Sequence, residues 1–225
     1  MERHIVAIGG WPGDDDAAAR AIEDFTLSHA RGRRICFVPT AAADASEAVV
    51  AFYAGWRGQG ELSHLEFFPW PPENLRELVL RQDVVVVSGG NTANMLAIWR
   101  VHGFDRILRE AWEAGVVLAG WSAGMICWFE AGVTDSFGPQ LDGMRDGLGF
   151  LAGSACPHYD GEDLRRPTYR RLVADGFPSG IAADDAVAVH FAGSDLSEVV
   201  TARPGATAYR VDSGGETRLE ARRLD

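Results

Sequence analysis

Along most of the chain, short apolar runs alternate with longer segments in which polar and apolar residues are mixed. The runs predict strands at 3–8, 34–39, 65–68, 83–87, 115–119 and 186–191. The segments between them predict helices at 17–28, 44–57, 75–80, 93–101, 105–114, 125–130 and 165–174. In the run at 83–87 the four residues after Asp83 are all valine, as expected for a central strand that is covered on both faces. This alternation predicts an α/β fold with one doubly wound, flavodoxin-like, mostly parallel sheet and helices on both faces.

The last third of the chain departs from that alternation. Residues 132–153 are rich in glycine and aspartate and predict a long loop, which in a compact domain usually borders a site. Residues 198–201 and 208–211 predict a C-terminal β-hairpin, with a glycine turn at Gly214-Gly215. Because the sequence has neither an internal repeat nor a linker, residues 1–225 are expected to form a single domain.

Composition narrows the range of functions. The net charge of −11 argues against nucleic acid and anionic membranes as partners. All 21 basic residues are arginine, which excludes a Schiff-base lysine, a Ser–Lys dyad and a P-loop lysine. Three scattered cysteines indicate a reduced compartment and no metal cluster. With no signal peptide apparent and no apolar run of ~20 residues, we expect a cytoplasmic protein. We predict no cofactor and no metal, and leave a homo-oligomer open.

The stretch Gly120-Trp121-Ser122-Ala123-Gly124 follows one predicted buried strand and precedes a predicted helix. Strand, Gly-x-Ser-x-Gly and helix form the layout of a nucleophile elbow, in which a sharp turn holds the serine in strained backbone. The amide N–H of Ala123 would then point to the same place as the Ser122 hydroxyl and could bind an oxyanion. An ordinary tight turn is the alternative.

A second glycine-rich turn, Ser88-Gly89-Gly90-Asn91-Thr92, follows the strand at 83–87. Either glycine could supply a second oxyanion donor, and we favour Gly90. Asn91 and Thr92 are candidates for substrate contacts or for the N-cap of the next helix. The earlier turn Gly9-Gly10 lacks the G-x-G-x-x-G spacing and is followed by three aspartates, so we interpret it as a loop with an aspartate helix cap.

The best candidate for a general base is His158, which follows a proline at the end of a strand or loop. The other histidines lie at strand starts, at helix ends or within a strand, and we assign them no function. They are His4, His29, His64, His102 and His190.

Four segments together resemble the peptidase E family of serine peptidases. They are Ser88-Gly89-Gly90-Asn91-Thr92, Gly120-Trp121-Ser122-Ala123-Gly124, Cys156-Pro157-His158-Tyr159 and a late Gly-Ile-x-x-Asp stretch that ends at Asp184. The resemblance covers nearly the whole chain and implies a fold similar to class I glutamine amidotransferases. Those relatives carry a cysteine at the elbow, so Ser122 argues against glutamine hydrolysis by a thiol.

The resemblance implies a triad of Ser122 as nucleophile, His158 as base and Asp184 as the acid that orients the imidazole. Asp185 lies one position away and is an alternative acid. Asp135 is the other rival, since it would give the Ser…Asp…His order of α/β-hydrolases. Aspartyl dipeptidases of the family hold the substrate's N-terminal aspartate with an arginine, and Arg165 matches that position. The alternative is that Arg165 lies on the solvent face of its helix and binds no substrate.

The sequence therefore favours a serine hydrolase that cleaves a small peptide, with an N-terminal aspartate as one candidate specificity. The alternative is a metabolite-binding or regulatory protein that keeps the fold with little turnover.

Overall fold

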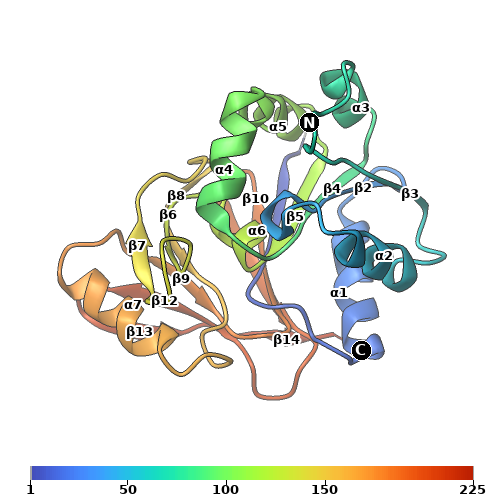
Figure 1. The fold of residues 1–225 in the computed structure, drawn as a ribbon. Helices are drawn as coiled ribbons and strands as arrows, with labels where there is room; N and C mark the ends of the chain where they lie inside the picture. The colour runs from blue at the N-terminus through green and yellow to red at the C-terminus, as the bar shows by residue number, and fades with distance from the viewer. Residues whose placement is uncertain (1, 225) are drawn as a thin grey trace.

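The computed structural model describes residues 2–224 and contains two β-sheets (Figure 1). The first sheet has eight strands in the order β14-β11-β10-β1-β5-β4-β2-β3. Their bounds are β1 His4–Ile8, β2 Arg34–Val38, β3 Glu61–His64, β4 Val84–Val87, β5 Val117–Trp121, β10 Val187–Ala192, β11 Asp195–Thr201 and β14 Arg222–Arg223. Strands β1, β5, β4, β2 and β3 are parallel, and β10 runs antiparallel to β1.

The second sheet has six strands in the order β13-β12-β9-β8-β6-β7. Their bounds are β6 Phe129–Thr134, β7 Asp142–Met144, β8 Leu151–Cys156, β9 Gly180–Ala183, β12 Ala208–Asp212 and β13 Gly215–Arg218. Its central strands β6, β8 and β9 are parallel. One hydrophobic cluster contains residues of both sheets, among them Ile5, Leu118, Ala155 and Ala208, so the two sheets share a core.

Helices cover both faces of the first sheet (Figure 1). They are α1 Asp16–Ser28, α2 Ser46–Gly55, α3 Leu75–Leu80, α4 Thr92–Val101, α5 Phe104–Glu113 and α6 Ala123–Ile126, with a 3₁₀ turn at Thr40–Ala42. In β4, Val84 and Val86 pack with residues of α1 and α2, whereas Val85 and Val87 pack with residues of α3, α4 and α5. This alternation follows from the two-residue repeat of a strand and explains why β4 is apolar throughout.

Helix α7 (Arg165–Ala174) packs on the second sheet through Tyr169 and Val173. No helix within residues 2–224 has the length and apolar character needed to cross a membrane.

The prediction of an α/β fold with a mostly parallel sheet and helices on both faces is confirmed, but the second sheet was not anticipated. The expected helix at 125–130 ends at Ile126, and β6 begins at Phe129. The expected loop at 132–153 contains the end of β6, all of β7 and the start of β8. Short apolar runs do not distinguish a buried helix from a strand, and β7 spans only three residues.

Two further expectations need correction. The third strand is Glu61–His64 and ends where the expected strand at 65–68 begins. The segments at 198–201 and 208–211 belong to different sheets, since β11 pairs with β10 and β12 pairs with β9 and β13. The C-terminal hairpin is formed by β12 and β13, and its turn does contain Gly214.

Candidate active site

Ser122 lies at the junction of β5 and α6, with φ +56° and ψ −111°. Such dihedrals are costly for a residue that carries a Cβ, so the predicted strained backbone is confirmed. The flanking glycines make this turn possible. A Cβ on Gly120 would lie 2.7 Å from the carbonyl oxygen of Gly124, and one on Gly124 would lie 2.5 Å from the carbonyl oxygen of Val87. The elbow is thus packed too closely for any side chain at either glycine.

The amide N–H groups of Gly90 and Ala123, the two residues predicted as oxyanion donors, have no acceptor in the described chain. The same holds for Gly89, the other glycine of that turn. Gly90 has φ +133°, and a Cβ there would overlap the carbonyl oxygen of Ala41. The turn that carries Gly90 lies against the elbow, because a Cβ on Gly89 would be 3.2 Å from the Cβ of Ser122.

His158 follows β8 and also has a positive φ, +52°. Its backbone N–H donates to the carbonyl oxygen of Gly9 at 3.3 Å. Its Nδ1 lies 2.7 Å from Oδ1 of Asp185. A carboxylate accepts, so Nδ1 carries the proton and Nε2 is left as the basic nitrogen. The hydrogen bond from His158 keeps the pKa of Asp185 below its usual value, although partial burial acts in the opposite direction.

The expectation that Asp184 accepts the hydrogen bond from His158 is wrong. Asp184 continues the pairing of β9 with β12: its N–H donates to the carbonyl oxygen of Thr207, and its Oδ2 accepts the Thr207 N–H at 2.9 Å. Successive side chains of an extended segment point in opposite directions, so Asp184 turns into the protein and Asp185 turns toward the imidazole. The carboxylate bonded to His158 is that of Asp185, the alternative one position beyond Asp184, and not that of Asp135.

The other candidate residues are not bonded to His158, are engaged in other contacts, or are buried. Asp135 is exposed and makes no bond to His158. Arg165 is only 3% exposed, and its guanidinium donates to Glu162 and to the carbonyl oxygen of Val133. Asn91 is the N-cap of α4, as its alternative interpretation held, and its side-chain amide donates to Ser136. The Thr92 side chain is buried.

The end of β1 brings Ser122 and His158 together. The N–H of Ser122 donates to the carbonyl oxygen of Ile8 at 3.2 Å, and that of His158 donates to Gly9. We expected a ring nitrogen of His158 to lie within reach of Ser122 Oγ, with some looseness when no substrate is bound, and no hydrogen bond between the two is present among residues 2–224. Catalytic hydrogen bonds of this kind are often long before substrate binds and tighten in the substrate complex.

Gly10 is a site residue that sequence reasoning missed. It forms an isolated parallel bridge with Asp185, and a Cβ at Gly10 would overlap Asp185 Oδ1 and lie 2.7 Å from His158 Nδ1. The signal was present in the paired glycines after the first strand, which we interpreted only as a loop. The aspartate cap expected there is confirmed, because Asp15 accepts the N–H of Ala18.

We expect Gly10→Ala to separate His158 from Asp185, since the added methyl has no room between them. A misplacement of about 1 Å in a catalytic group can cost roughly 10²-fold, so kcat should fall by about that factor. The measurement is kcat on any peptide that the wild type hydrolyses. Gly138→Ala is the matched control, because a Cβ there meets no atom within 4 Å. Equal activity of the two variants would contradict the role given to Gly10.

Asp184 should make stability depend on pH in a recognisable way. Burial raises its pKa to about 6, against the N–H of Thr207 and the charges of Arg203 and Arg166, while Asp160 adds to the rise. The unfolded chain, with an ordinary pKa of about 4, releases this proton earlier, so folding stability falls as pH rises from about 4 to about 6.

Asp184→Asn removes that titration, because an amide does not ionise. The amide oxygen can still accept the Thr207 N–H, so the hydrogen bond is kept. Between pH 4 and pH 7 the variant should gain about 2 kcal/mol in unfolding free energy relative to wild type. Urea unfolding at both pH values measures the difference. If the unfolding free energies of the two proteins differed by the same amount at both pH values, ionisation of Asp184 would not destabilise the folded protein.

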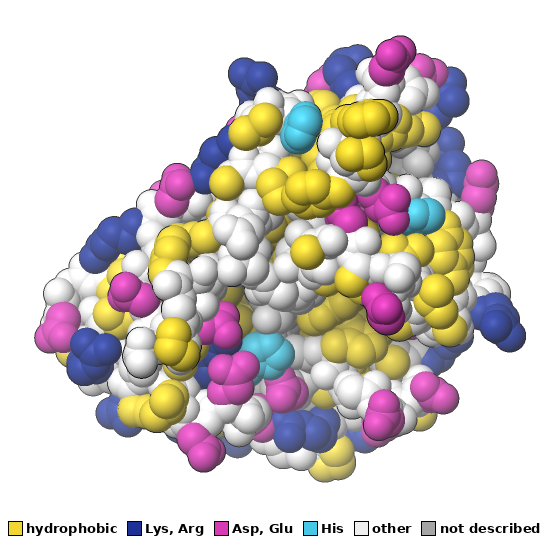
Figure 2. All heavy atoms as spheres, in the orientation of Figure 1, with side chains coloured by type: hydrophobic (Ala, Val, Ile, Leu, Met, Phe, Trp, Pro, Cys, Tyr) yellow, Lys and Arg dark blue, Asp and Glu magenta, His cyan; other side chains and the backbone are white. Residues whose placement is uncertain are grey.

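Aromatic side chains stand beside the nucleophile. The ring of Trp121, next to Ser122, lies 4.9 Å from the ring of Trp11, and Trp56 stacks behind Trp11 at 6.5 Å. Figure 2 shows a recessed hydrophobic surface near the middle of the face in view, with charged side chains around it. The site therefore combines one apolar wall with a charged rim.

Comparisons with known proteins show the family and the fold of the chain. The family model described as "Peptidase family S51" matches residues 5–199. The chain belongs to peptidase family S51. It is 46% identical over 213 residues to a protein of Bacillus subtilis (strain 168) named "Uncharacterized peptidase YgaJ", covering 93% of this chain and 92% of that protein. A Listeria innocua protein, "Uncharacterized peptidase Lin0382", is 25% identical over 158 residues, covering 66% and 74% of the two chains.

Solved structures show the same fold as this S51 chain. A peptidase from an acI-B1 actinobacterium aligns with a TM-score of 0.69 at 20% identity, over 98% of this chain and 95% of that one. A putative peptidase E protein from Listeria monocytogenes EGD-e aligns with a TM-score of 0.62 at 17% identity, over 98% and 100%. The resemblance to peptidase E seen in the sequence is confirmed, and the chain is a serine-type peptidase by family.

Proposed function

We propose that this S51 peptidase hydrolyses small peptides through a Ser122–His158–Asp185 triad and an acyl-enzyme. The observation that carries the proposal is the elbow. Ser122 is held in strained backbone next to two unpaired amide N–H groups, and the imidazole that follows β8 is bonded to a carboxylate. These are the parts that acyl transfer requires: a nucleophile, an oriented base and oxyanion donors.

Each group has a defined task in the proposed reaction. Ser122 Oγ attacks the scissile carbonyl carbon and gives its proton to Nε2 of His158, while the N–H groups of Gly90 and Ala123 hold the oxyanion. His158 then passes the proton to the leaving amine, and the peptide C–N bond breaks. Water attacks the resulting ester, His158 takes a proton from it, and that proton returns to Ser122. Asp185 stays ionised throughout and stabilises the imidazolium.

For substrate selection we propose Arg203, and not Arg165, as the arginine available to a substrate carboxylate. Arg203 is about half exposed and forms an ion pair with Oδ2 of Asp160. Oδ1 of the same Asp160 accepts the backbone N–H of Asp185, so this pair adjoins the triad. A peptide with an N-terminal aspartate is therefore one class to test, and peptides with an apolar side chain that fits beside Trp11 and Trp121 are the other.

Labelling with a serine-reactive fluorophosphonate tests the mechanism without a known substrate. We expect one adduct per chain on Ser122, identified by peptide mass mapping, and none on the folded Ser122→Ala variant. A panel of dipeptides with N-terminal Asp, Leu or Phe then ranks the two substrate classes. A folded wild type that neither labels nor cleaves would favour the alternative, a metabolite-binding or regulatory protein with this fold.

A further inference from the structure

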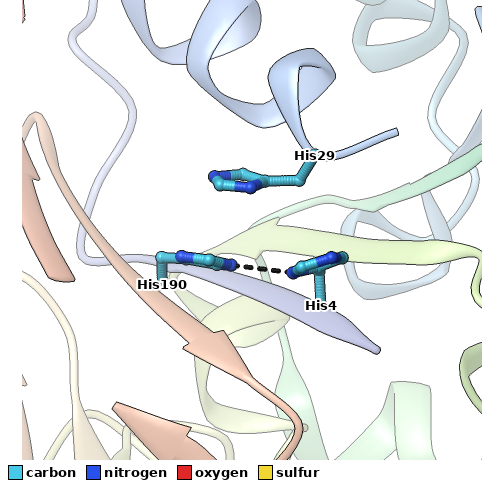
Figure 3. Close-up of side chains that lie close together, drawn as sticks. All are labelled: His4, His29 and His190. Carbon is cyan, nitrogen blue, oxygen red and sulfur yellow. Dashed lines mark hydrogen bonds between the residues drawn. The ribbon is translucent and has the colours of Figure 1, made fainter. Parts of the chain in front are cut away.

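Three histidines that are distant in sequence meet on the first sheet. His4 begins β1, His190 lies in β10 next to it, and His29 is the C-cap of α1, which packs on these strands (Figure 3). Nδ1 of His4 lies 3.0 Å from Nε2 of His190. The His29 ring stacks on that of His190, with centroids 3.8 Å apart and planes 20° apart, and lies 5.2 Å from the His4 ring.

The ring nitrogens have a spacing that suits a metal ion. Each histidine offers one nitrogen, and the three atoms lie within 4.8 Å of one another. Tetrahedral zinc with Zn–N bonds of 2.0–2.1 Å holds its nitrogens about 3.3 Å apart. The pair between β1 and β10 is therefore already at ligand spacing, and only the His29 ring must tilt to join it.

Two nitrogens of this trio are buried without any partner in the described chain. They are Nε2 of His29 and Nδ1 of His190, and the His190 side chain is 3% exposed. Buried polar atoms are normally satisfied, so the orphaned Nε2 of His29 points to a ligand shared with the His4–His190 pair, while the orphaned Nδ1 of His190 belongs to a ring whose Nε2 already faces that pair. The surrounding charges are mixed: Glu2 lies 3.9 Å from His4 Nε2, and Glu198, paired with Arg222, is cross-strand from His190.

We propose that His4, His29 and His190 bind one divalent transition metal ion of the zinc class. Neutral imidazole is a preferred ligand of Zn²⁺, Cu²⁺ and Ni²⁺, whereas Mg²⁺ and Ca²⁺ prefer oxygen. The metal takes the place of the hydrogen that lies between Nδ1 of His4 and Nε2 of His190. The ring that donated this hydrogen then carries it on its other nitrogen. Water or a nearby carboxylate completes the coordination sphere.

The position of this histidine trio gives the metal a structural role. His4 lies at the amino end of β1, whereas Gly9 and Gly10 at its carboxyl end contact the triad, roughly 15 Å away by strand rise. Binding would fasten the end of α1 to β1 and β10. The composition-based expectation of no metal rested on the cysteines and on histidines considered singly, so it did not consider a site assembled by three separate elements.

The test is zinc titration by calorimetry of untagged protein that has been stripped with a chelator. We expect one equivalent of Zn²⁺ per chain and a rise in Tm when it is bound. His29→Gln should weaken binding at least tenfold and remove the Tm rise. The matched control is His102→Gln, because His102 is the C-cap of α4 as His29 is of α1 but lies outside the trio. His4→Gln provides a second variant if the first does not fold.

His158 could also bind zinc, so the stoichiometry must be measured in His158→Gln as well. That variant should retain the equivalent that His29→Gln loses. The proposal is overturned if the folded wild type binds no Zn²⁺, or if His29→Gln and His4→Gln both bind it as the wild type does. It is equally overturned if only His158→Gln abolishes binding. None of these measurements depends on peptidase activity.

Discussion

Replacing Ser122 with alanine is expected to abolish peptide hydrolysis, with kcat falling on the order of 10⁶-fold. Loss of the nucleophile in the serine protease subtilisin has an effect of that size, and the residual rate there comes from the oxyanion donors and binding alone. Here the amides of Gly90 and Ala123 remain in the variant, so bound peptide should still be held. KM should therefore change much less than kcat, which steady-state kinetics would show.

Stability separates the role of the hydroxyl from that of the backbone. Ser122→Gly should be as inactive as Ser122→Ala but more stable than it by about 1 kcal/mol, because glycine adopts φ +56° and ψ −111° without strain. Urea unfolding of the two variants measures this difference. If Ser122→Gly were the less stable of the two, the strain assigned to the elbow would be refuted.

The second large effect is expected at Asp185. Changing it to asparagine leaves a side chain of the same shape but replaces a carboxylate, which only accepts, with an amide that can also donate, so the Nδ1–H tautomer of His158 is no longer fixed. In proteases of the chymotrypsin type the same change in the triad costs about 10⁴ in kcat, and we expect a loss of similar order here.

Asp184→Asn is the internal control for that loss. It alters the adjacent carboxyl, which bonds Thr207 and not the imidazole, so kcat should change less than about tenfold. The opposite ranking of the two variants would return the acid to Asp184.

Sequence reasoning located the elements that carry a strong local signature. The elbow at Ser122 needs glycines at fixed offsets, and the turn at Gly90 needs a residue that tolerates a positive φ. Both requirements are visible in the sequence as glycines. His158 was found because of its place after a strand. The choice between Asp184 and Asp185 depended on which way one extended residue points, and that was fixed by the pairing of β9 with β12.

The failures have a common physical origin in contacts between distant segments. Arg165 occupies the predicted position, but Glu162 and the Val133 carbonyl, from an unpredicted strand, draw its guanidinium inward. The role of Gly10 depends on Asp185 lying against it, and these residues, distant in sequence, are brought together where β1 pairs with β10. The second sheet itself was missed because its strands are short and its apolar runs resemble helix or loop.

The two-sheet architecture also determines when the chain becomes a peptidase. Ser122 is carried by the first sheet, whereas His158 and Asp185 follow β8 and β9 of the second. The chain enters the second sheet at β6, leaves it after β9 and returns at β12, so neither sheet is a continuous segment. A chain in which only the first sheet has formed would hold a serine without its base. Partly folded molecules would then be inert toward the peptides around them, and activity would appear only on completion of the fold.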